Sequence, residues 1–585
     1  MDPQVAAHRL TEIALLLEVR GENPFKSRAF VHAARTIGEL DEEDIAPLVR
    51  SKAIAKLPGI GATTLAVLAD LVETGESSYL ESLKDSTPEG LVEMMRIPGL
   101  GPTRIHRLHE GLGIETVADL EAAARDGRIA KLSGFGVKTA DKILKGIAIL
   151  RETSLQFKHN VAYPEALRLQ RAIGRLPDVE RVEIAGALRR IAEVVDEIDL
   201  VAGCSTGDDE VISALGKVPG VQEVLEENGN ARLKMITGIR ANVRFADAKS
   251  FPVAYWRATG SAEHCEAVIE RLSVRGFALR DDQLVDAKGK VVKGADEEAI
   301  YAKAGLAYVP VELREYKGEI AAAESGTLPD LIELGDLRGI LHCHSTYSDG
   351  STSIAEMAEA ARARGWSYLG VSDHSQAASY AGGLNRDAVL RQHDEIDALN
   401  ATLKGFRVLK GIEADILADG TVDYADDLLD RFEYVIGSIH SRFGMGQVEM
   451  TERILKAMTD PRLTIIGHPT GRLLLRREPF AVDMDAVMEM AAEQHIALEL
   501  NCDPNRLDLD WRWLQLARQR GVTIEVGPDA HSPSELSFVD FGIQIGRKGW
   551  LEKGNVLNTR DAKDVLTFAR ARRESTAPPG AKRGS

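Results

Sequence analysis

Short apolar segments alternate with helical patterns between residues 340 and 531, and this alternation constrains the fold more than any other feature of the chain. The clearest apolar segments are 368–372, 435–437, 463–466, 497–500 and 522–526. Strands that alternate with helices are typical of a parallel sheet, and repeated units of this kind close into a (β/α) barrel. Because barrel enzymes place their chemistry at the C-terminal ends of the strands, polar residues that follow these segments are candidate site residues.

Histidines and carboxylates occupy those positions. His342 and His344 follow the extended stretch 339–341, and residues at i and i+2 of a strand share a face, so both imidazoles can bind one ion while Cys343 packs the opposite way. The other candidates at the ends of apolar segments are Asp373, His374, Glu413, His440, His468, Asp529 and His531. A lone histidine at a strand end usually makes a structural hydrogen bond, but six of the chain's fourteen histidines are in this set. The set therefore predicts a centre for divalent metal ions.

A second pattern recurs three times near the N-terminus, where an apolar residue, Pro or Ser, Gly, an apolar residue and Gly precede a helical segment. Glycine allows a tight turn close to a ligand, and the free N–H groups of the following helix attract anions. One such turn would be interpreted as a joint between packed helices, whereas three favour contacts with the DNA backbone that carry no sequence information. The glycines concerned are Gly59, Gly61, Gly99, Gly101, Gly134 and Gly136.

Bulk properties set the limits of the prediction. A chain of 585 residues exceeds one hydrophobic core and predicts roughly three to five domains. A net charge of −18 argues against broad adhesion to nucleic acid, although it leaves local contacts open. No apolar run approaches the roughly 20 residues of a membrane span. The four scattered cysteines, and first residues without the pattern of a secretory signal, predict a cytoplasmic protein.

Residues 1 to about 318 resemble a family X DNA polymerase, in particular its bacterial branch. The resemblance is carried by 28–37, the three glycine turns, Gly186-Ala187-Leu188-Arg189-Arg190, Glu197-Ile198-Asp199, Thr259-Gly260-Ser261 and 308–315. It implies nucleotide addition with two Mg²⁺ or Mn²⁺ ions held by three carboxylates. It also implies a dNTP held by Gly186, Arg190, Gly260 and Ser261, and gapped or nicked DNA or 3′ ends as partners without sequence preference.

The carboxylate positions depart from the family's pattern, because they are Glu197, Asp199 and Asn242. Glu197 is one methylene longer than the family's aspartate, in a site that tolerates little displacement. Asn242 offers a neutral carbonyl where the family has a charge. Ala187 lacks the hydroxyl expected to contact nucleotide phosphate. Our hypothesis is a degenerate polymerase site with weak or lost templated synthesis, and the alternative is an active gap-filling polymerase.

Residues from about 338 to 570 resemble the polymerase and histidinol phosphatase (PHP) phosphoesterases. The resemblance implies three ions, the first held by His342, His344, Glu413 and Asp529, the second by Glu413, His440 and His468, and the third by Asp349, His374 and His531. Imidazoles mixed with carboxylates suit Mn²⁺, Zn²⁺ or Fe²⁺. A metal-bound hydroxide would attack phosphorus, so no protein nucleophile is expected. Arg472 is a candidate for a bidentate phosphate contact, with an ordinary surface arginine as the alternative.

Together these patterns predict a multidomain protein. The expected parts are a helical DNA-binding domain (1–85), a fingers-like helix-hairpin-helix domain (86–155), an α/β nucleotidyltransferase-like palm and thumb (156–318), a linker (319–335), a distorted (β/α)7 PHP barrel (336–572) and a disordered tail (573–585). The preferred function is a monomeric DNA-repair enzyme that trims DNA from the 3′ side, with removal of blocked 3′ ends or incision at abasic sites as related activities. A small-molecule phosphatase and a non-catalytic DNA-end-binding scaffold are the alternatives.

Overall fold

The structure is a computed structural model that describes residues 1–40, 42, 44–153, 155–204, 208–227, 229–294 and 296–575. The chain divides into two compact units. The first contains Met1–Phe157, Leu167–Val182 and Cys204–Phe245, and the second contains Lys158–Ala166, Glu183–Gly203 and Ala246–Ser585. Among the described residues, no helix has both the length and the apolar character needed to cross a membrane.

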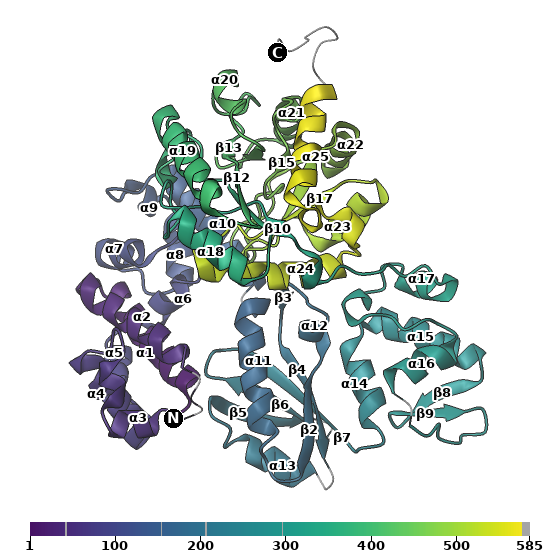
Figure 1. Ribbon diagram of the computed structural model, residues 1–585. Coiled ribbons are helices and arrows are strands. Elements are labelled where there is room, and N and C mark those ends of the chain that lie inside the picture. Colours follow the sequence, from purple (N-terminus) through teal and green to yellow (C-terminus); the bar gives the residue numbers. More distant parts are fainter. Residues whose placement is uncertain are drawn as a thin grey trace. The chain divides into compact units, whose positions relative to one another are not determined.

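The first unit begins with an all-helical region, as the amphipathic patterns predict. Its helices are α1 (Pro3–Val19), α2 (Pro24–Gly38), α3 (Ala46–Arg50), η1 (Ala53–Lys56), α4 (Ala62–Thr74), α5 (Ser78–Asp85), α6 (Glu89–Met94), α7 (Pro102–Leu112), α8 (Val117–Arg125), α9 (Arg128–Lys131) and α10 (Val137–Thr153). Helices α1 and α2 lie side by side (Figure 1) and bury Leu10, Leu17 and Phe30 in a shared core. Ile105 and Ile143 belong to a separate core that α7, α8 and α10 form.

The three glycine turns have the same backbone conformation. Their first glycines, Gly59, Gly99 and Gly134, have φ angles of 78°, 78° and 80°, a region that residues with a side chain rarely adopt. The second glycine of the first two turns is the N-cap of α4 and of α7, and the third turn leads directly into α10. Each turn therefore presents the N-terminus of a helix in the same way, as a helix-hairpin-helix motif does.

The α/β elements that follow are β1 (Phe157–Lys158), α11 (His159–Ile173), β2 (Val179–Ile184), α12 (Gly186–Arg189), β3 (Val194–Val195), β4 (Ile198–Cys204), α13 (Asp208–Leu215), β5 (Val221–Glu227), β6 (Asn230–Met235) and β7 (Arg240–Ala246). Strands β5, β6 and β7 of the first unit pair antiparallel in sequence order. In β6, Ala231, Leu233 and Met235 are buried and alternate with exposed residues, because successive side chains of a strand point to opposite faces.

The second unit continues with α14 (Phe251–Thr259), α15 (Ala262–Val274), β8 (Phe277–Arg280), β9 (Gln283–Asp286), α16 (Glu297–Ala304), η2 (Val311–Leu313), α17 (Glu319–Ser325) and η3 (Leu334–Asp336). Part of the expected linker is therefore a helix, and this corrects the sequence interpretation. The segment is rich in small residues because α17 packs closely against its neighbours, with Ile320 in the hydrophobic core. The Glu319 carboxylate lies 2.6 Å from Nδ1 of the buried His264.

The rest of the second unit is the predicted barrel. Its strands are β10 (Gly339–Ile340), β11 (Tyr368–Val371), β12 (Arg407–Lys410), β13 (Glu413–Asp415), β14 (Ile436–Ser438), β15 (Ile465–Ile466), β16 (Ala497–Asn501) and β17 (Ile524–Gly527). They form parallel sheets in the orders β10-β11-β12 and β13-β14-β15-β16-β17. Parallel bridges between His374 and Glu413 and between Cys343 and Ala530 join the two sheets. The eight strands β10 to β17 make a ring of seven positions, because β12 and β13 follow one another directly and share one position.

Helices surround these strands (Figure 1). They are α18 (Ile354–Ala363), α19 (Arg386–Thr402), α20 (Asp426–Leu429), α21 (Gln447–Ala457), α22 (Met484–Gln494), α23 (Trp511–Gln519), α24 (Phe538–Lys548) and α25 (Ala562–Ser575), with short turns η4 (Ser379–Ala381), η5 (Pro533–Ser537), η6 (Lys553–Asn555) and η7 (Leu557–Thr559). The strands are buried on both sides, which explains their continuous apolar sequences. Helix α25 includes the first three residues of the predicted tail, and residues 576–585 lie outside the described part of the chain.

Candidate metal centre

The predicted metal ligands gather at one end of the barrel, because they stand at strand termini or in the loop after β10. His342 and His344 follow β10, Asp349 lies in the next loop, His374 follows β11, Glu413 opens β13, His440 follows β14, His468 follows β15, and Asp529 and His531 follow β17. His468 and Asp529 have φ angles of 28° and 52°. Such backbone costs on the order of 1–3 kcal/mol and persists where surrounding structure enforces it, often at functional sites.

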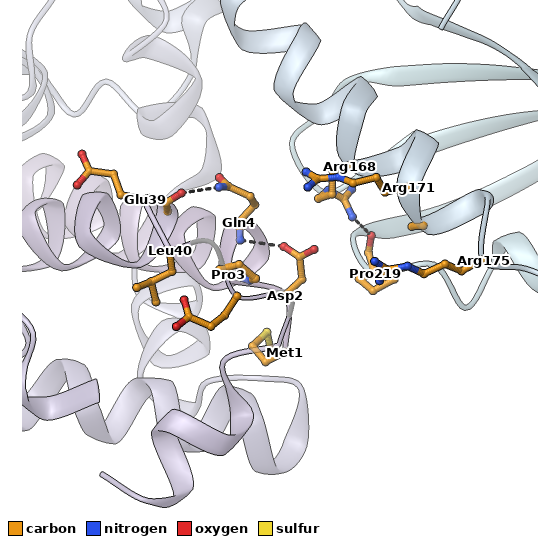
Figure 2. A pocket seen from close by; sticks show the side chains of 13 residues that line it. Met1, Asp2, Pro3, Gln4, Glu39, Leu40, Arg168, Arg171, Arg175 and Pro219 are labelled. Atoms are coloured by element: carbon orange, nitrogen blue, oxygen red, sulfur yellow. Dashed lines mark hydrogen bonds between the residues drawn. The ribbon is translucent and has the colours of Figure 1, made fainter. Parts of the chain in front are cut away.

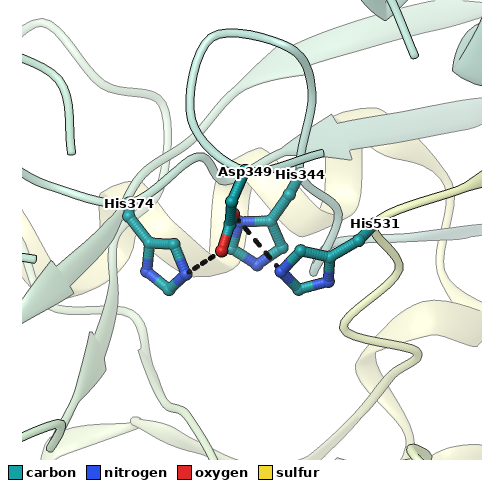
Figure 3. Close-up of side chains that lie close together, drawn as sticks. All are labelled: His344, Asp349, His374 and His531. Atoms are coloured by element: carbon teal, nitrogen blue, oxygen red, sulfur yellow. Dashed lines mark ion pairs between the residues drawn. The ribbon is translucent and has the colours of Figure 1, made fainter. Parts of the chain in front are cut away.

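One group of donors converges on the carboxylate of Asp349. Figure 3 shows His344, His374 and His531 around it. Asp349 Oδ1 lies 3.8 Å from His344 Nδ1 and 3.3 Å from His531 Nε2, and Asp349 Oδ2 lies 3.7 Å from His374 Nε2. One atom from each of the four residues lies within 4.8 Å of the others, so the group can surround a single ion.

A second group surrounds Glu413, which is 1% exposed. Its Oε1 lies 3.0 Å from His468 Nε2 and 3.3 Å from His440 Nε2, and its Oε2 lies 2.8 Å from His374 Nδ1. His374 thus approaches both Glu413 and Asp349. The sequence interpretation assigned this histidine to a single ion, whereas the geometry places it between two groups of donors.

The third group consists of His342, His344 and Asp529. Asp529 Oδ1 lies 3.5 Å from His342 Nε2 and 3.1 Å from His344 Nε2. Glu413 Oε1 also lies 3.5 Å from His342 Nε2, so the second and third groups are contiguous. All nine residues that the sequence predicts are therefore brought together.

The chemistry of these groups fits divalent cations. His342 Nε2, His344 Nδ1 and Glu413 Oε2 are buried atoms without a hydrogen-bond partner among the described residues. Buried polar atoms are normally satisfied, so the unsatisfied atoms in these three groups fit a bound ligand. Imidazole nitrogens and carboxylate oxygens together are donors that Mn²⁺, Fe²⁺ and Zn²⁺ accept.

The electrostatics of the centre agree with this interpretation. Burial lowers the pKa of His344 to about 3, so this imidazole is neutral and can donate a lone pair to a cation. Burial raises the pKa of Asp349, but a hydrogen bond with His531 and nearby imidazoles outweigh it and bring the pKa to about 2. Burial opposes protonation of His342, yet the carboxylates of Glu499, Asp529 and Glu413 together outweigh it, and the pKa of His342 is raised. A cation would replace that proton.

Two carboxylates that the sequence interpretation did not select hold the histidines in place. Glu499 Oε1 lies 2.5 Å from His342 Nδ1, and its Oε2 accepts a hydrogen bond from the His468 backbone N–H at 2.6 Å. Asp415 Oδ1 lies 2.8 Å from His440 Nδ1. Such outer contacts fix the orientation of metal-binding imidazoles. The available signal was a glutamate inside an otherwise apolar strand, since buried charges are rare unless they are paired.

The structure places the arginines differently from the sequence interpretation. Arg472 is 7% exposed, and its guanidinium pairs with Asp510 and donates to backbone carbonyls, including that of Arg506 at 2.9 Å. Its contacts therefore favour a packing role over a phosphate contact. Arg506 itself approaches the centre, with Nε 3.8 Å from Asp529 Oδ2.

The polymerase-like residues of the second unit are engaged in internal contacts. The Arg190 guanidinium donates to Glu315 at 3.0 Å and to the Thr259 carbonyl at 2.8 Å. Ser261 is the N-cap of α15. Gly186 has a φ of 61°, and a Cβ added there would lie 2.0 Å from Asp199 Oδ2, so this position requires glycine. Glu197 is partly buried one residue before β4.

Asn242 lies on β7 of the first unit, opposite Arg232 in the register, and its Oδ1 accepts a hydrogen bond from Arg232 Nε at 3.3 Å. The amide is thus used within the strand pair.

A cavity of 520 Å³ in the first unit lies between the start of α1 and the end of α11 (Figure 2). Arg168, Arg171 and Arg175 lie on one side, and Asp2 and Glu39 lie on the other. Because its walls carry opposite charges, the cavity does not select for an anion such as phosphate.

The barrel and its cluster of donors define a metal-dependent phosphoesterase of the PHP class, and comparison with known families agrees. The PHP domain family matches residues 341–502. A helix-hairpin-helix domain matches 1–77, a SAM-like helix-hairpin-helix tandem matches 91–148, and the DNA polymerase beta thumb matches 254–315.

The whole chain is 36% identical to the DNA polymerase/3′-5′ exonuclease PolX of Bacillus subtilis over 564 residues, which cover 96% of this chain and 98% of that protein. The chain therefore belongs to the bacterial family X DNA polymerases with a C-terminal PHP domain, and the resemblance drawn from its motifs is confirmed. Probable phosphatases are similar to part of the chain only. The probable phosphatase of Clostridium acetobutylicum is 26% identical over 40% of this chain and 94% of its own length. The probable phosphatase of Syntrophotalea carbinolica is 32% identical over 28% of this chain and 64% of its own length.

Proposed function

We propose that the PHP barrel hydrolyses phosphodiester bonds at the 3′ end of DNA, as a 3′–5′ exonuclease that requires divalent cations. The observation that carries the proposal is the convergence of nine histidine and carboxylate side chains at the C-terminal ends of the barrel strands. The three helix-hairpin-helix turns support DNA as the substrate, because their helix N-termini suit phosphates of any sequence. The Bacillus subtilis relative carries a 3′–5′ exonuclease in its name.

Three divalent ions held by these donors, Mn²⁺ or Zn²⁺ with Fe²⁺ as a further candidate, would activate water and neutralise phosphate charge. Glu413 presents its two oxygens to different imidazoles and would hold cations together with them. Glu499 and Asp415 orient His342 and His440 from behind. Arg506, whose Nε lies 3.8 Å from Asp529 Oδ2, would contact a phosphate oxygen.

The test compares the wild type with His342→Ala/His344→Ala on 5′-labelled DNA and, separately, on histidinol phosphate, both with Mn²⁺. The control is His495→Asn, because His495 is an exposed histidine of the same domain with a φ of 53° that asparagine tolerates. Shortening of DNA that the double variant loses and the control keeps is the expected result.

The same experiment decides between the alternatives. Hydrolysis of histidinol phosphate without DNA shortening would favour a small-molecule phosphatase. DNA binding without hydrolysis of either substrate would favour a scaffold with structural metals. The exonuclease is preferred because the probable phosphatases match only part of this chain, whereas the PolX relative matches nearly all of it.

We infer that templated polymerisation is weak or lost. Glu197 and Asn242 replace the family's aspartates, and the Arg190 guanidinium is committed to Glu315 and Thr259. Primer extension on gapped DNA with Mg²⁺ or Mn²⁺ tests this inference. Robust synthesis that disappears in Asp199→Ala would refute it and establish an active gap-filling polymerase.

A further inference from the structure

An aromatic side chain stands exposed beside the metal centre. Tyr380 lies in η4, in the segment that connects β11 and His374 to α19. The residue is 71% exposed. Its ring centroid lies 6.2 Å from that of His374 and 6.3 Å from that of His440, with interplanar angles of 54° and 74°. The ring is therefore tilted against both imidazoles instead of stacking on them.

The backbone that carries Tyr380 is firmly held. Ala378 and Ala381, two residues before and one residue after Tyr380, are buried, at 0% and 5% exposure. Leu384 N–H donates to the His374 carbonyl at 2.9 Å and so closes the loop. A Cβ at Gly383 would lie 1.9 Å from a backbone oxygen, so the loop packs tightly there. The exposure of the ring therefore does not come from a loose loop.

Exposure of a single aromatic residue is common and by itself indicates nothing. Here the ring lies against two of the candidate ligands, His374 and His440, and its hydroxyl has no hydrogen-bond partner among the described residues. A flat apolar face next to a phosphate-binding centre suits a nucleobase, because every base has a π-face and stacks without regard to its identity.

We propose that Tyr380 is the platform on which the terminal base of a DNA strand stacks while the adjoining phosphate lies at the metal centre. The proposal rests on the proposed exonuclease function and assigns a positioning residue to it. Stacking would fix the last nucleotide without reading its sequence. It would also distinguish a nucleotide from a small phosphate ester that has no base.

The experiment uses the full-length protein with Mn²⁺ and two oligonucleotides that differ only at the 3′ end, one with an ordinary terminal nucleotide and one with a terminal abasic residue. The variants are Tyr380→Ala and Tyr380→Phe, with Leu334→Ala as the control. Leu334 is an exposed apolar side chain that precedes β10, and the centre lies at the opposite ends of the strands.

Stacking on an aromatic side chain is worth about 1–3 kcal/mol per base, so Tyr380→Ala is expected to lower kcat/KM on the ordinary end by about 5- to 150-fold. On the abasic end, the same variant should remain within about 3-fold of the wild type, because no base is available to stack. Tyr380→Phe and Leu334→Ala should behave like the wild type on both ends.

Equal losses of Tyr380→Ala on both ends would overturn the proposal and indicate damage to the metal centre, which metal analysis of the variant would reveal. An unchanged rate on the ordinary end would overturn it as well. If Tyr380→Phe lost as much as Tyr380→Ala, the hydroxyl and not the ring face would be responsible, and the proposal would be wrong. A wild type that cleaves neither end would refute the exonuclease itself, whereas the other outcomes leave that function standing.

Discussion

Glu499 and Glu525 face each other in the register of β16 and β17, and replacing each with glutamine is expected to have different consequences. Both are fully buried. Glu499 uses both oxygens, at 2.5 Å from His342 Nδ1 and 2.6 Å from the His468 backbone nitrogen. A glutamine has one acceptor oxygen, so Glu499→Gln leaves one of these two donors facing an amide N–H.

The magnitude follows from that lost contact. A hydrogen bond to a charged group contributes about 1.5–3 kcal/mol, and outer contacts of metal ligands typically change metal affinity by about 10- to 100-fold. On the proposed function, we therefore expect Glu499→Gln to weaken metal binding at His342 by about 10- to 100-fold and to lower the rate of DNA hydrolysis at limiting metal.

Glu525→Gln is the matched control. Burial and the neighbouring Glu499 raise the pKa of Glu525 to about 8, so its side chain is mostly protonated and neutral at pH 7. Glutamine reproduces that neutral form and can still accept the hydrogen bond from Asn558 Nδ2. The unfolded chain releases the Glu525 proton above a pH of about 4.5, whereas the folded chain keeps it until a pH of about 8. The contribution of Glu525 to the free energy of unfolding of the wild type is therefore lost as the pH rises toward 8. Glu525→Gln carries no such proton and should not show this loss.

Metal content after dialysis and competition with a chelator measure the affinity of both variants, and thermal unfolding measures their stability. Wild-type metal affinity in Glu499→Gln would show that the carboxylate does not support His342. An equal loss of affinity in Glu525→Gln would show that any substitution at this pair of positions on β16 and β17 disturbs the centre, and the reasoning from individual contacts would be wrong.

Three further perturbations test other parts of the chain. Burial lowers the pKa of His159 to about 4, so the unfolded chain takes up a proton below pH 6.5 that the folded chain excludes. The free energy of unfolding should therefore fall by about 3 kcal/mol from pH 7 to 4. His159→Gln should make this pH dependence, measured by denaturant unfolding, flatter. Lys548→Met removes a fully buried ammonium from Glu315 and should cost about 2–3 kcal/mol in denaturant unfolding, whereas an unchanged midpoint would argue against this contact. Gly99→Ala and Gly75→Ala impose the same strain, because both have φ near 80° and open space at Cβ. Each should lose about 1–2 kcal/mol of stability, but only Gly99→Ala should weaken DNA binding in a filter or anisotropy assay.

Local features of the protein follow from the sequence alone. The turns at Gly59, Gly99 and Gly134 share one conformation because a positive φ is decided by the residue itself and its immediate neighbours. The barrel follows from apolar segments short enough to be strands and separated by helices. His342 and Asp529 could be selected as ligands because each stands just beyond such a segment, at the end of the barrel where strand termini meet.

The tertiary structure decided which of these groups touch. The strands that carry His374 and Asp529 lie far apart in the sequence, so distances between their side chains depend on how the barrel closes. For the same reason Glu499 could not be recognised as a support of His342, and Arg472 remained a candidate for phosphate contact although its guanidinium pairs with Asp510. A sequence fixes the conformation of a turn or the face of a strand locally, whereas the composition of a metal centre is set by contacts between segments that only the folded barrel brings together.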